Sequence, residues 1–408
     1  MFNRDLLKEV QLAAKEYPVI TITGPRQSGK TTLAQMAFAK KAYVNLEEPQ
    51  NRRFAIDDPR GFLGQYPDGV IIDEAHKAPD IFSYIQVSAD KLKKNGHYIL
   101  TGSHHFLLLE AVSQSLAGRA AIYHLLPLGF DELKKAKVFP SSLDELIRAG
   151  AYPKVYAQKL NAYKWYGNYV NTYLERDVRA MKQVSDLMIF QRFMKLVAAR
   201  SGTILNYASI ANDLGVSANT VKGWVSILEA SFIVFLLAVY HRNFNKRLVK
   251  SPKIYFYDTG LLSYLLDIQN DAVLDVHPLK GQIFETLIVS ELMKQYYHHG
   301  RRPRLYFWRD KTGHEIDCVM EKGMEAIPLE IKSGRTINSS CFDNLDYWKR
   351  LNKTNLSYLV YAGETAHQRH ECSILPYDQT TGIINSIARR PDGHDLSNFA
   401  SGGYPGRV

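Results

Sequence analysis

The stretch from residue 24 to residue 32 has the residue types and the spacing of a phosphate-binding loop. It reads Gly24-Pro25-Arg26-Gln27-Ser28-Gly29-Lys30-Thr31-Thr32 and contains the pattern G-x-x-x-x-G-K-[ST]. Gly24 and Gly29 allow the backbone to turn its N–H groups towards phosphate oxygens. Lys30 supplies a positive charge to the β- and γ-phosphates, and the hydroxyl of Thr31 can complete the oxygen shell of Mg²⁺. The sequence therefore predicts that this stretch binds ATP together with Mg²⁺.

Two acidic residues, Asp73 and Glu74, follow the apolar run Val70–Ile72. The carboxyl end of a parallel strand lies at the sheet edge that faces the nucleotide. Asp73 would then bind the hydration shell of Mg²⁺, and Glu74 would activate the attacking water. An isolated Asp-Glu pair also often caps a helix. Next to an intact phosphate loop we favour the catalytic interpretation.

Short strands and one helix must position these groups. Val19–Ile22 leads into the loop, and the helix that follows the loop adds the positive end of its dipole to the phosphate site. His97–Leu100 is a further strand, followed by Thr101 and Ser103, one of which is predicted to sense the γ-phosphate. The sequence thus predicts an α/β fold with the parallel sheet of P-loop NTPases.

Length and composition restrict the class of protein. A chain of 408 residues allows two or three domains, and a formal net charge of +10 favours a polyanionic partner or an anionic surface. Three widely spaced cysteines form neither a disulfide framework nor a zinc pattern. The N-terminus lacks the apolar core of a signal peptide, and no apolar run approaches the roughly 18 residues that span a bilayer. We therefore expect a cytoplasmic protein without membrane contact.

The motifs together resemble those of AAA+-type ATPases of bacteria and archaea, in particular an uncharacterised group fused to a C-terminal domain of unknown function. The similarity covers residues 1–385 and rests on the loop, IIDEAH, YILTGS and SLAGRAAIYHLLPLGFDEL. It implies a homo-oligomer in which an arginine completes the ATP site in cis or from a neighbouring subunit, and Arg119 in LAGR matches that arginine. Arg119 could instead be a structural residue paired with Glu110 or Asp131, and both interpretations stay open. The DEAH tetrad alone would fit a helicase, but residues 131–200 show no second set of ATPase strands.

Several regions are predicted along the chain. We expect an AAA+-type ATPase domain over residues 1–135, a helical connector over 136–200, a winged helix-turn-helix over 201–268, a restriction-endonuclease-like α/β domain over 269–385 and a disordered tail over 386–408. The aromatic residues Trp165, Tyr169 and Tyr173 recur at helical spacing in the connector, which is typical of a packed core.

The predicted helix-turn-helix carries the candidate DNA contacts. Gly215 permits the turn, and Ser217 caps a second helix that would expose Asn219, Thr220 and Lys222 to a major groove. Further cations follow where a wing is expected: Lys246, Arg247, Lys250 and Lys253. Such modules also dock onto proteins, so a DNA partner and a partner protein both remain open.

The last candidate site combines Glu285, Asp317, Glu330 and Lys332. A helix carrying Glu285 precedes a hairpin carrying Asp317, and a following strand places Glu330 and Lys332 on one face because strand side chains alternate. This order resembles the PD-(D/E)xK nuclease-like fold, in which the carboxylates hold Mg²⁺ and the lysine assists the attacking hydroxide. We predict a second metal site here. The alternative is a Glu330–Lys332 ion pair in a domain that does not cleave.

The predicted function is Mg²⁺-dependent ATP binding and hydrolysis coupled to DNA binding or processing, with a nuclease-like C-terminal site. The alternative is a nucleotide-dependent signalling or toxin–antitoxin-like switch whose C-terminal domain only binds a partner protein.

Overall fold

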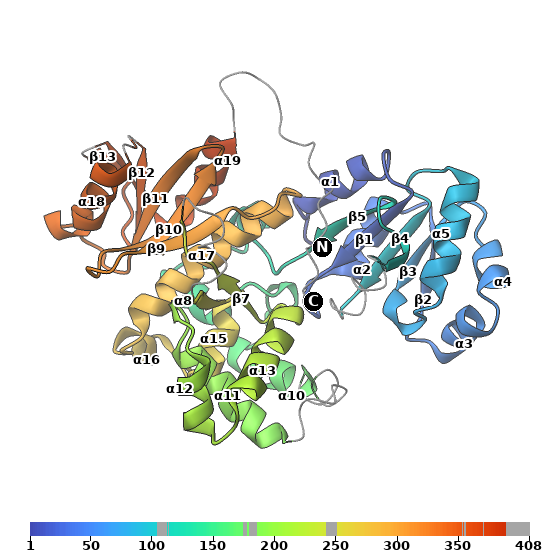
Figure 1. The fold of residues 1–408 in the computed structure, drawn as a ribbon, viewed down its shortest axis with the longest axis horizontal. Helices are drawn as coiled ribbons and strands as arrows, with labels where there is room; N and C mark the ends of the chain where they lie inside the picture. Colours follow the sequence, from blue (N-terminus) through green and yellow to red (C-terminus); the bar gives the residue numbers. More distant parts are fainter. Residues whose placement is uncertain are drawn as a thin grey trace. The chain divides into compact units, whose positions relative to one another are not determined.

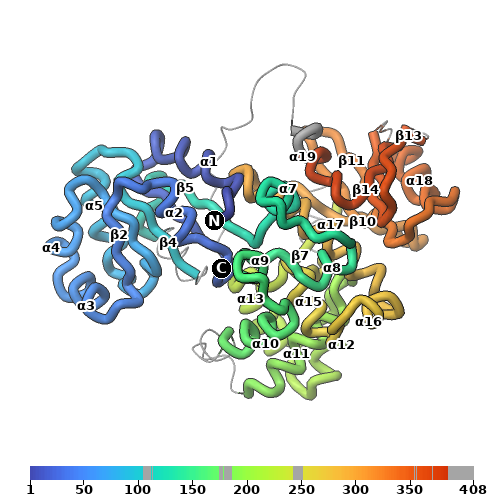
Figure 2. The backbone as a smooth tube through the Cα atoms, turned by 180° about the vertical axis from the view of Figure 1, so that it is seen from behind, coloured from blue at the N-terminus to red at the C-terminus, as the bar shows by residue number. Residues whose placement is uncertain are grey.

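The computed structural model describes residues 1–103, 112, 114–173, 178, 186–241, 251–352, 354, 356–369 and 371–388. These residues form two compact units (Figures 1 and 2). Met1–Leu128 and Tyr296–Arg302 belong to the first, which we call the N-terminal unit. Gly129–Gln295 and the described residues from Pro303 to Ala388 belong to the second, the C-terminal unit.

A parallel sheet forms the centre of the N-terminal unit, as predicted, and it has five strands. Its strands are β1 (Val19–Thr23), β2 (Ala42–Asn45), β3 (Val70–Asp73), β4 (Tyr98–Gly102) and β5 (Ala120–His124), in the order β2-β3-β4-β1-β5. β1 lies between β4 and β5, and Thr23 pairs with Gly102 and His124. The carboxyl ends of β1, β3 and β4 therefore meet at one edge of the sheet. The sequence patterns had not indicated the edge strand β5.

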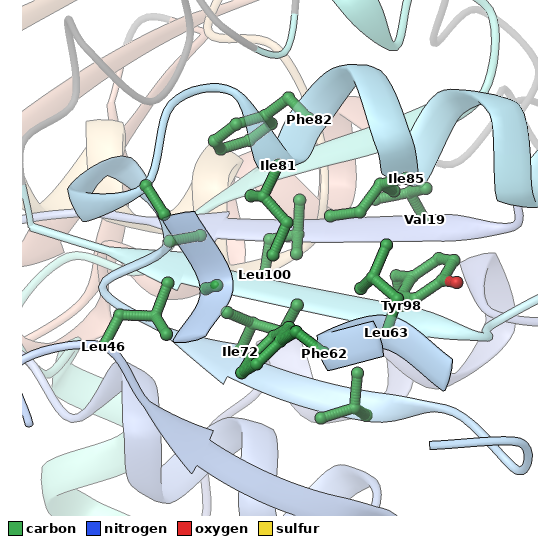
Figure 3. Close-up of a cluster of buried hydrophobic side chains, with 14 of the residues drawn as sticks. Val19, Leu46, Phe62, Leu63, Ile72, Ile81, Phe82, Ile85, Tyr98 and Leu100 are labelled. Carbon is green, nitrogen blue, oxygen red and sulfur yellow. The ribbon is translucent and has the colours of Figure 1, made fainter. Parts of the chain in front are cut away.

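Helices cover both faces of this sheet (Figure 1). One face packs against α1 (Leu6–Ala13) and α2 (Lys30–Ala37), and the other against α3 (Pro49–Asp57), α4 (Pro59–Gly64) and α5 (Ile81–Leu92). Figure 3 shows the second of these cores, where Phe62 and Ile81 pack against Ile72 and Leu100 of the sheet. A parallel sheet buried on both faces requires apolar side chains on both, which explains the near-continuous apolar strands.

Helices open the C-terminal unit. They are α7 (Phe130–Lys135), α8 (Leu143–Ala149), α9 (Pro153–Ala157), α10 (Ala162–Tyr173) and α11 (Leu187–Ala199). Trp165 and Tyr169 stack with ring centroids 5.3 Å apart and are both buried, as is Tyr173. The aromatic stripe is therefore core, as predicted.

Two helices joined by a tight turn follow. α12 (Tyr207–Leu214) ends at Gly215, whose φ of 69° is left-handed, and α13 (Ala218–Ala230) begins after Ser217, whose hydroxyl accepts the N–H of Thr220. An antiparallel sheet packs beside them, formed by β6 (Thr203–Ile204), β8 (Lys253–Phe256) and β7 (Val234–Leu237) in that order. The helix–turn–helix order matches the prediction. Residues 242–250, where the wing was expected, lie outside the described residues, so the winged-helix assignment stays a prediction.

The last region contains a mixed sheet. After α15 (Thr259–Leu265), α16 (Asp271–Asp275) and α17 (Lys280–His298) come β9 (Leu305–Arg309), β10 (Glu315–Lys322), β11 (Glu325–Lys332), α18 (Asp343–Asn352), β12 (Ser357–Tyr361), β13 (His367–Arg369), β14 (Cys372–Pro376) and α19 (Thr381–Ala388). The sheet order is β13-β14-β12-β11-β10-β9, with β11, β12 and β14 parallel and the other pairs antiparallel. The predicted helix–hairpin–strand order is present. The nuclease-like assignment stays a prediction. Residues 389–408 of the expected disordered tail lie outside the described residues.

Within the described part of the chain, no helix combines the length and the apolar character needed to cross a membrane.

Candidate functional site

The phosphate loop connects β1 to α2 and contains two residues that must be glycine. Gly24 has a φ of 146°, and a Cβ there would lie 2.2 Å from the carbonyl oxygen of Leu125. Gly29 has a φ of 96° and caps α2. Both values are strained for residues with a side chain. The loop therefore combines left-handed backbone with the amino end of a helix, the geometry that binds phosphate.

Lys30 is the first residue of α2, and its side chain lies against the loop. Its Nζ donates to the carbonyl oxygens of Gly24 at 2.9 Å and Pro25 at 2.8 Å. The ammonium group is thus held beside the loop backbone, and its contact with the β- and γ-phosphates stays a prediction.

Asp73, the last residue of β3, is the centre of a hydrogen-bond cluster. Its Oδ2 accepts from the hydroxyl of Thr31 at 2.7 Å and from Tyr43 at 2.9 Å, and its Oδ1 accepts from Thr101. Thr31 and Asp73, the predicted Mg²⁺ residues, are therefore adjacent. Their hydroxyl and carboxylate oxygens are the hard donors that Mg²⁺ prefers, so the residues present fit this ion.

Tyr43 is a member of this cluster that the sequence analysis missed. Burial and the adjacent charge of Asp73 raise the pKa of Tyr43 well above its usual value. The hydroxyl therefore stays protonated and donates to the carboxylate. No motif marks this tyrosine, since its position follows only from the parallel pairing of β2 with β3.

Glu74 follows Asp73 with a left-handed φ of 53°. Its Oε2 accepts the backbone N–H of Ser103 at 3.1 Å, and its Oε1 accepts the Ser103 hydroxyl at 3.0 Å. The ring of His76 approaches the same carboxylate, with Nδ1 3.2 Å from Oε2. The carboxylate is thus oriented by the residues after β4, as expected if it acts at the nucleotide edge of the sheet.

The two candidate γ-phosphate sensors contact different acids. Thr101 binds Asp73, and Ser103 binds Glu74. Both lie at the predicted edge, next to the residues proposed to bind Mg²⁺ and to activate water. The choice between them stays a prediction.

Arg119 lies where the strands begin, at the end of the sheet opposite the phosphate loop. It immediately precedes β5, whose last residue, His124, pairs with Thr23 at the end of β1. A strand rises roughly 3.3 Å per residue, so the five residues of β5 separate Arg119 from the loop by about 16 Å. Arg119 therefore cannot complete the ATP site of its own subunit. A role across a subunit boundary stays a prediction.

The structure pairs Arg119 with an acid that the sequence analysis did not name. Its Nε and Nη2 donate to the two carboxylate oxygens of Asp90 at 2.6 and 2.9 Å. Sequence proximity had pointed to Asp131 or to Glu110, which lies outside the described residues. Asp90 is brought near by the packing of α5, which sequence spacing does not reveal.

In the C-terminal unit, a buried lysine neutralises part of the predicted carboxylate site. Lys253 donates to Oε1 of Glu285 at 3.0 Å and to Oε1 of Glu315 at 2.6 Å, and its side chain is only 4% exposed. The hydroxyl of Tyr255 donates to the same oxygen of Glu285 at 2.5 Å. Burial and the nearby charge of Asp317 raise the pKa of Glu285 to about 7. Lys253 was predicted as one of the cations in the wing region, but it lies on β8 and is buried, so its side chain is not exposed to DNA.

Glu330 and Lys332 form an ion pair. Nζ of Lys332 lies 2.5 Å from Oε2 of Glu330, which is 1% exposed. Burial, with the charge of Asp317, raises the pKa of Glu330 to about 8. Asp317 accepts the backbone N–H of Ile331 at 2.8 Å. The ion pair is the alternative that the sequence analysis had left open.

The predicted second metal site is not assembled in this conformation. Within the described residues, no three His, Cys, Asp or Glu side chains are placed so that they could hold one metal ion. Glu285 is turned to Lys253, and Glu330 to Lys332. The donor set therefore does not fit a metal here, because lysines already balance the charge. The cleavage site remains a prediction from the sequence.

The surface of α13 is polar where the DNA contact is predicted. Asn219 and Lys222 are exposed, whereas Val221 and Trp224 are buried against the core. One face of the second helix is therefore exposed. The predicted wing cations Lys246, Arg247 and Lys250 lie outside the described residues.

Family models match three successive regions of the chain. Residues 16–134 match an AAA domain. Residues 140–272 and 280–380 match two domains of unknown function, DUF8612 and DUF4143. The predicted combination of an AAA-type ATPase with a C-terminal domain of unknown function is therefore confirmed.

Relatives share most of the chain. An uncharacterized protein of Mycobacterium tuberculosis is 28% identical over 398 residues, which is 94% of this chain and 86% of the relative. An uncharacterized protein of Methanocaldococcus jannaschii is 24% identical over 421 residues, 85% of this chain and 82% of the relative. Among solved structures, the Walker-type ATPase of Pyrococcus abyssi is 13% identical with a TM-score of 0.44, covering 65% of this chain and 96% of that one. The relatives thus span the ATPase region together with the regions that follow it.

Proposed function

We propose that this chain, an AAA-type ATPase with a C-terminal domain of unknown function, uses ATP hydrolysis to control how its C-terminal unit engages DNA. The observation that carries the ATPase part is the cluster at one edge of the parallel sheet. There Lys30 lies in the phosphate loop, Thr31 contacts Asp73, and Ser103 orients Glu74. These are the groups that phosphoryl transfer to water requires.

Different residues of the chain would bind ATP, activate water and hold Mg²⁺ during ATP hydrolysis. Backbone N–H groups of the loop and the ammonium of Lys30 hold the phosphates of ATP. Glu74 takes a proton from water while the water oxygen bonds to the γ-phosphorus and the bond to the β-phosphate oxygen breaks, which releases ADP. Thr31 and Asp73 would hold Mg²⁺, which neutralises the charge on the β- and γ-phosphate oxygens when it is bound.

The exposed face of α13 and the net charge of +10 support a DNA partner. We expect the affinity for duplex DNA to fall steeply as salt rises, because bound cations are released from the phosphates. Lys222→Gln should weaken binding and reduce the slope of log affinity against log salt by about 1. Fluorescence anisotropy with a labelled duplex over a salt series measures both quantities.

Lys91→Gln is the matched control, because Lys91 is also exposed and lies on α5 of the N-terminal unit. Its slope should equal that of the wild type. Equal slopes for Lys222→Gln and the wild type would show that the DNA phosphates are contacted by residues outside α13. Absence of binding at low salt would favour the alternative, a nucleotide-dependent switch that binds a partner protein.

A second candidate activity, DNA cleavage at the C-terminal carboxylates, has less support. The lysine partners of Glu285 and Glu330 favour a domain that binds without cutting. Plasmid nicking with Mg²⁺ or Mn²⁺ tests this point. Cleavage that disappears in Asp317→Ala while ATP hydrolysis persists would restore the nuclease interpretation.

The homo-oligomer implied by the AAA+ resemblance can be tested through Arg119. If Arg119 completes a neighbour's site, mixing Arg119→Ala with Glu74→Gln should regain part of the activity that each variant lacks. Some interfaces in the mixture then combine an intact Arg119 with an intact Glu74. Steady-state hydrolysis over a range of mixing ratios measures the effect. Stable mixed oligomers without recovery, or a monomer with ATP bound, would exclude the role in trans.

A further inference from the structure

Arg4 is a buried cation that contacts the outside of the phosphate loop. It precedes α1 and is only 5% exposed. Its Nη1 donates to the carbonyl oxygen of Ser28 at 2.7 Å, and its Nη2 donates to that of Leu126 at 2.6 Å. The guanidinium therefore ties the loop to the backbone that follows β5. None of the sequence motifs includes this residue.

The bond to Ser28 has a consequence for phosphate binding. The carbonyl of Ser28 and the N–H of Gly29 belong to one trans peptide, so they point in opposite directions. Holding the carbonyl on the guanidinium therefore directs the Gly29 N–H away from Arg4 and into the loop. Gly29 has a left-handed φ of 96° and, as a glycine, could adopt other conformations at little cost. Arg4 supplies a bond that selects the one in which the N–H can reach a phosphate.

The phosphate loop also packs on residues 125–126, the segment that Arg4 contacts after β5. A Cβ on Gly24 would lie 2.2 Å from the carbonyl oxygen of Leu125, so the first loop glycine packs directly on the residue before Leu126. Arg4 then fixes the next residue, Leu126, to Ser28 on the far side of the loop. The loop is thus held at both ends against residues 125–126.

A third segment reaches the same guanidinium. Nε2 of His298 lies 3.4 Å from Nη2 of Arg4, and His298 is buried. Because arginine only donates, Nε2 is the acceptor in any hydrogen bond between the two groups. His298 is the last residue of α17, a helix that begins at Lys280, where the match to the second domain of unknown function also begins. This contact lies within the N-terminal unit.

We propose that Arg4 is a positioning residue for ATP, which orients the Gly29 amide and connects the phosphate loop to the end of α17. Displacement of the last turn of α17 would change the position of the guanidinium and hence the loop's affinity for nucleotide. The inference rests on the proposed ATPase function, because its readout is nucleotide affinity. It assigns to nucleotide binding a residue outside the loop motif and a contact between that residue and the last turn of α17.

The test is ADP and ATP affinity of Arg4→Ala in the full chain, measured by calorimetry. We expect both dissociation constants to rise by about tenfold or more, since a charged donor to the loop is lost. Added guanidinium ion should restore part of the affinity by occupying the space of the missing group, whereas ammonium ion should not. His298→Ala should raise the dissociation constants by a smaller factor. Lys8→Ala, which removes an exposed cation of α1, should leave them unchanged.

The outcomes are distinguishable. Wild-type affinity in Arg4→Ala with only a lower melting temperature would reduce Arg4 to a structural residue and overturn the proposal. If Arg4→Ala does not fold, nucleotide affinity is measured for Arg4→Lys instead. This variant keeps the positive charge but cannot bind Ser28 and Leu126 through two separate nitrogen atoms. Unchanged affinity in that variant also overturns the proposal. Failure of the wild type itself to bind nucleotide would instead remove the proposed function. Unchanged affinity in His298→Ala would remove the connection to α17.

Discussion

Glu74→Gln is expected to bind ATP normally and to hydrolyse it about 10²–10⁴-fold more slowly than the wild type. The amide has the shape of the carboxylate but cannot accept the proton of the attacking water. Ser103 holds the carboxylate where the sheet strands end, so removing its basicity acts on a group that is already oriented. Binding affinity for ATP and steady-state release of phosphate are the two measurements.

Two further variants make this result specific. Lys30→Ala should lose nucleotide binding itself, because the phosphates lose their charged partner. Ser103→Ala should slow hydrolysis less than Glu74→Gln, since the backbone N–H of residue 103 still holds the carboxylate. Normal turnover in Glu74→Gln would mean that the Glu74 side chain only holds Ser103 in place after β4. The proton acceptor would then have to be sought elsewhere.

Lys253→Met is expected to lower the free energy of unfolding by about 3–5 kcal/mol, because removing one partner of a buried ion pair leaves uncompensated charge. Lys253 is the cation between Glu285 and Glu315, and its side chain is 4% exposed. Denaturant unfolding followed by circular dichroism measures the change. Lys280→Met is the matched control. Lys280 pairs with Asp275 at the surface and lies 3.8 Å from Asp144, so the expected loss of stability is much smaller than in Lys253→Met.

The penalty in Lys253→Met should depend on pH. In the wild type the pKa of Glu285 is already raised to about 7 by burial, despite the ammonium beside it. Removing that ammonium raises the pKa of Glu285 further, so the folded state keeps a proton that the unfolded state has lost above its ordinary pKa. The loss in free energy of unfolding caused by Lys253→Met should therefore be smallest near pH 5 and should grow as pH rises towards 8. A penalty independent of pH would show that lost packing, not charge, destabilises the variant.

Much of the ATPase edge could be predicted from the sequence because local patterns determine it. The spacing from Gly24 to Thr31 requires a particular loop between a strand and a helix, and the acids after Val70–Ile72 must lie where that strand ends. Strands buried on both faces are also the easiest to recognise, as their apolar runs are continuous. The match to an AAA domain agrees with these local signals.

Tertiary structure decided which residues surround those motifs. Tyr43 reaches Asp73 only because β2 pairs with β3, and Arg4 reaches Ser28 only because α1 packs beside the loop. Because β5 pairs in parallel with β1, Arg119 lies at the amino ends of these strands, far from the phosphate loop. It therefore cannot complete the ATP site of its own subunit. A pairing between distant segments leaves no spacing signal in the chain.

The C-terminal carboxylates illustrate the same division. Strand alternation correctly places Glu330 beside Lys332, since that is a property of two residues on one strand. It carries no information about Lys253, which comes from β8 and neutralises Glu285 and Glu315. Whether acids bind a metal or an internal lysine depends on which side chains fold into the space between them. That is decided by packing of distant segments and not by the order of residues along one strand.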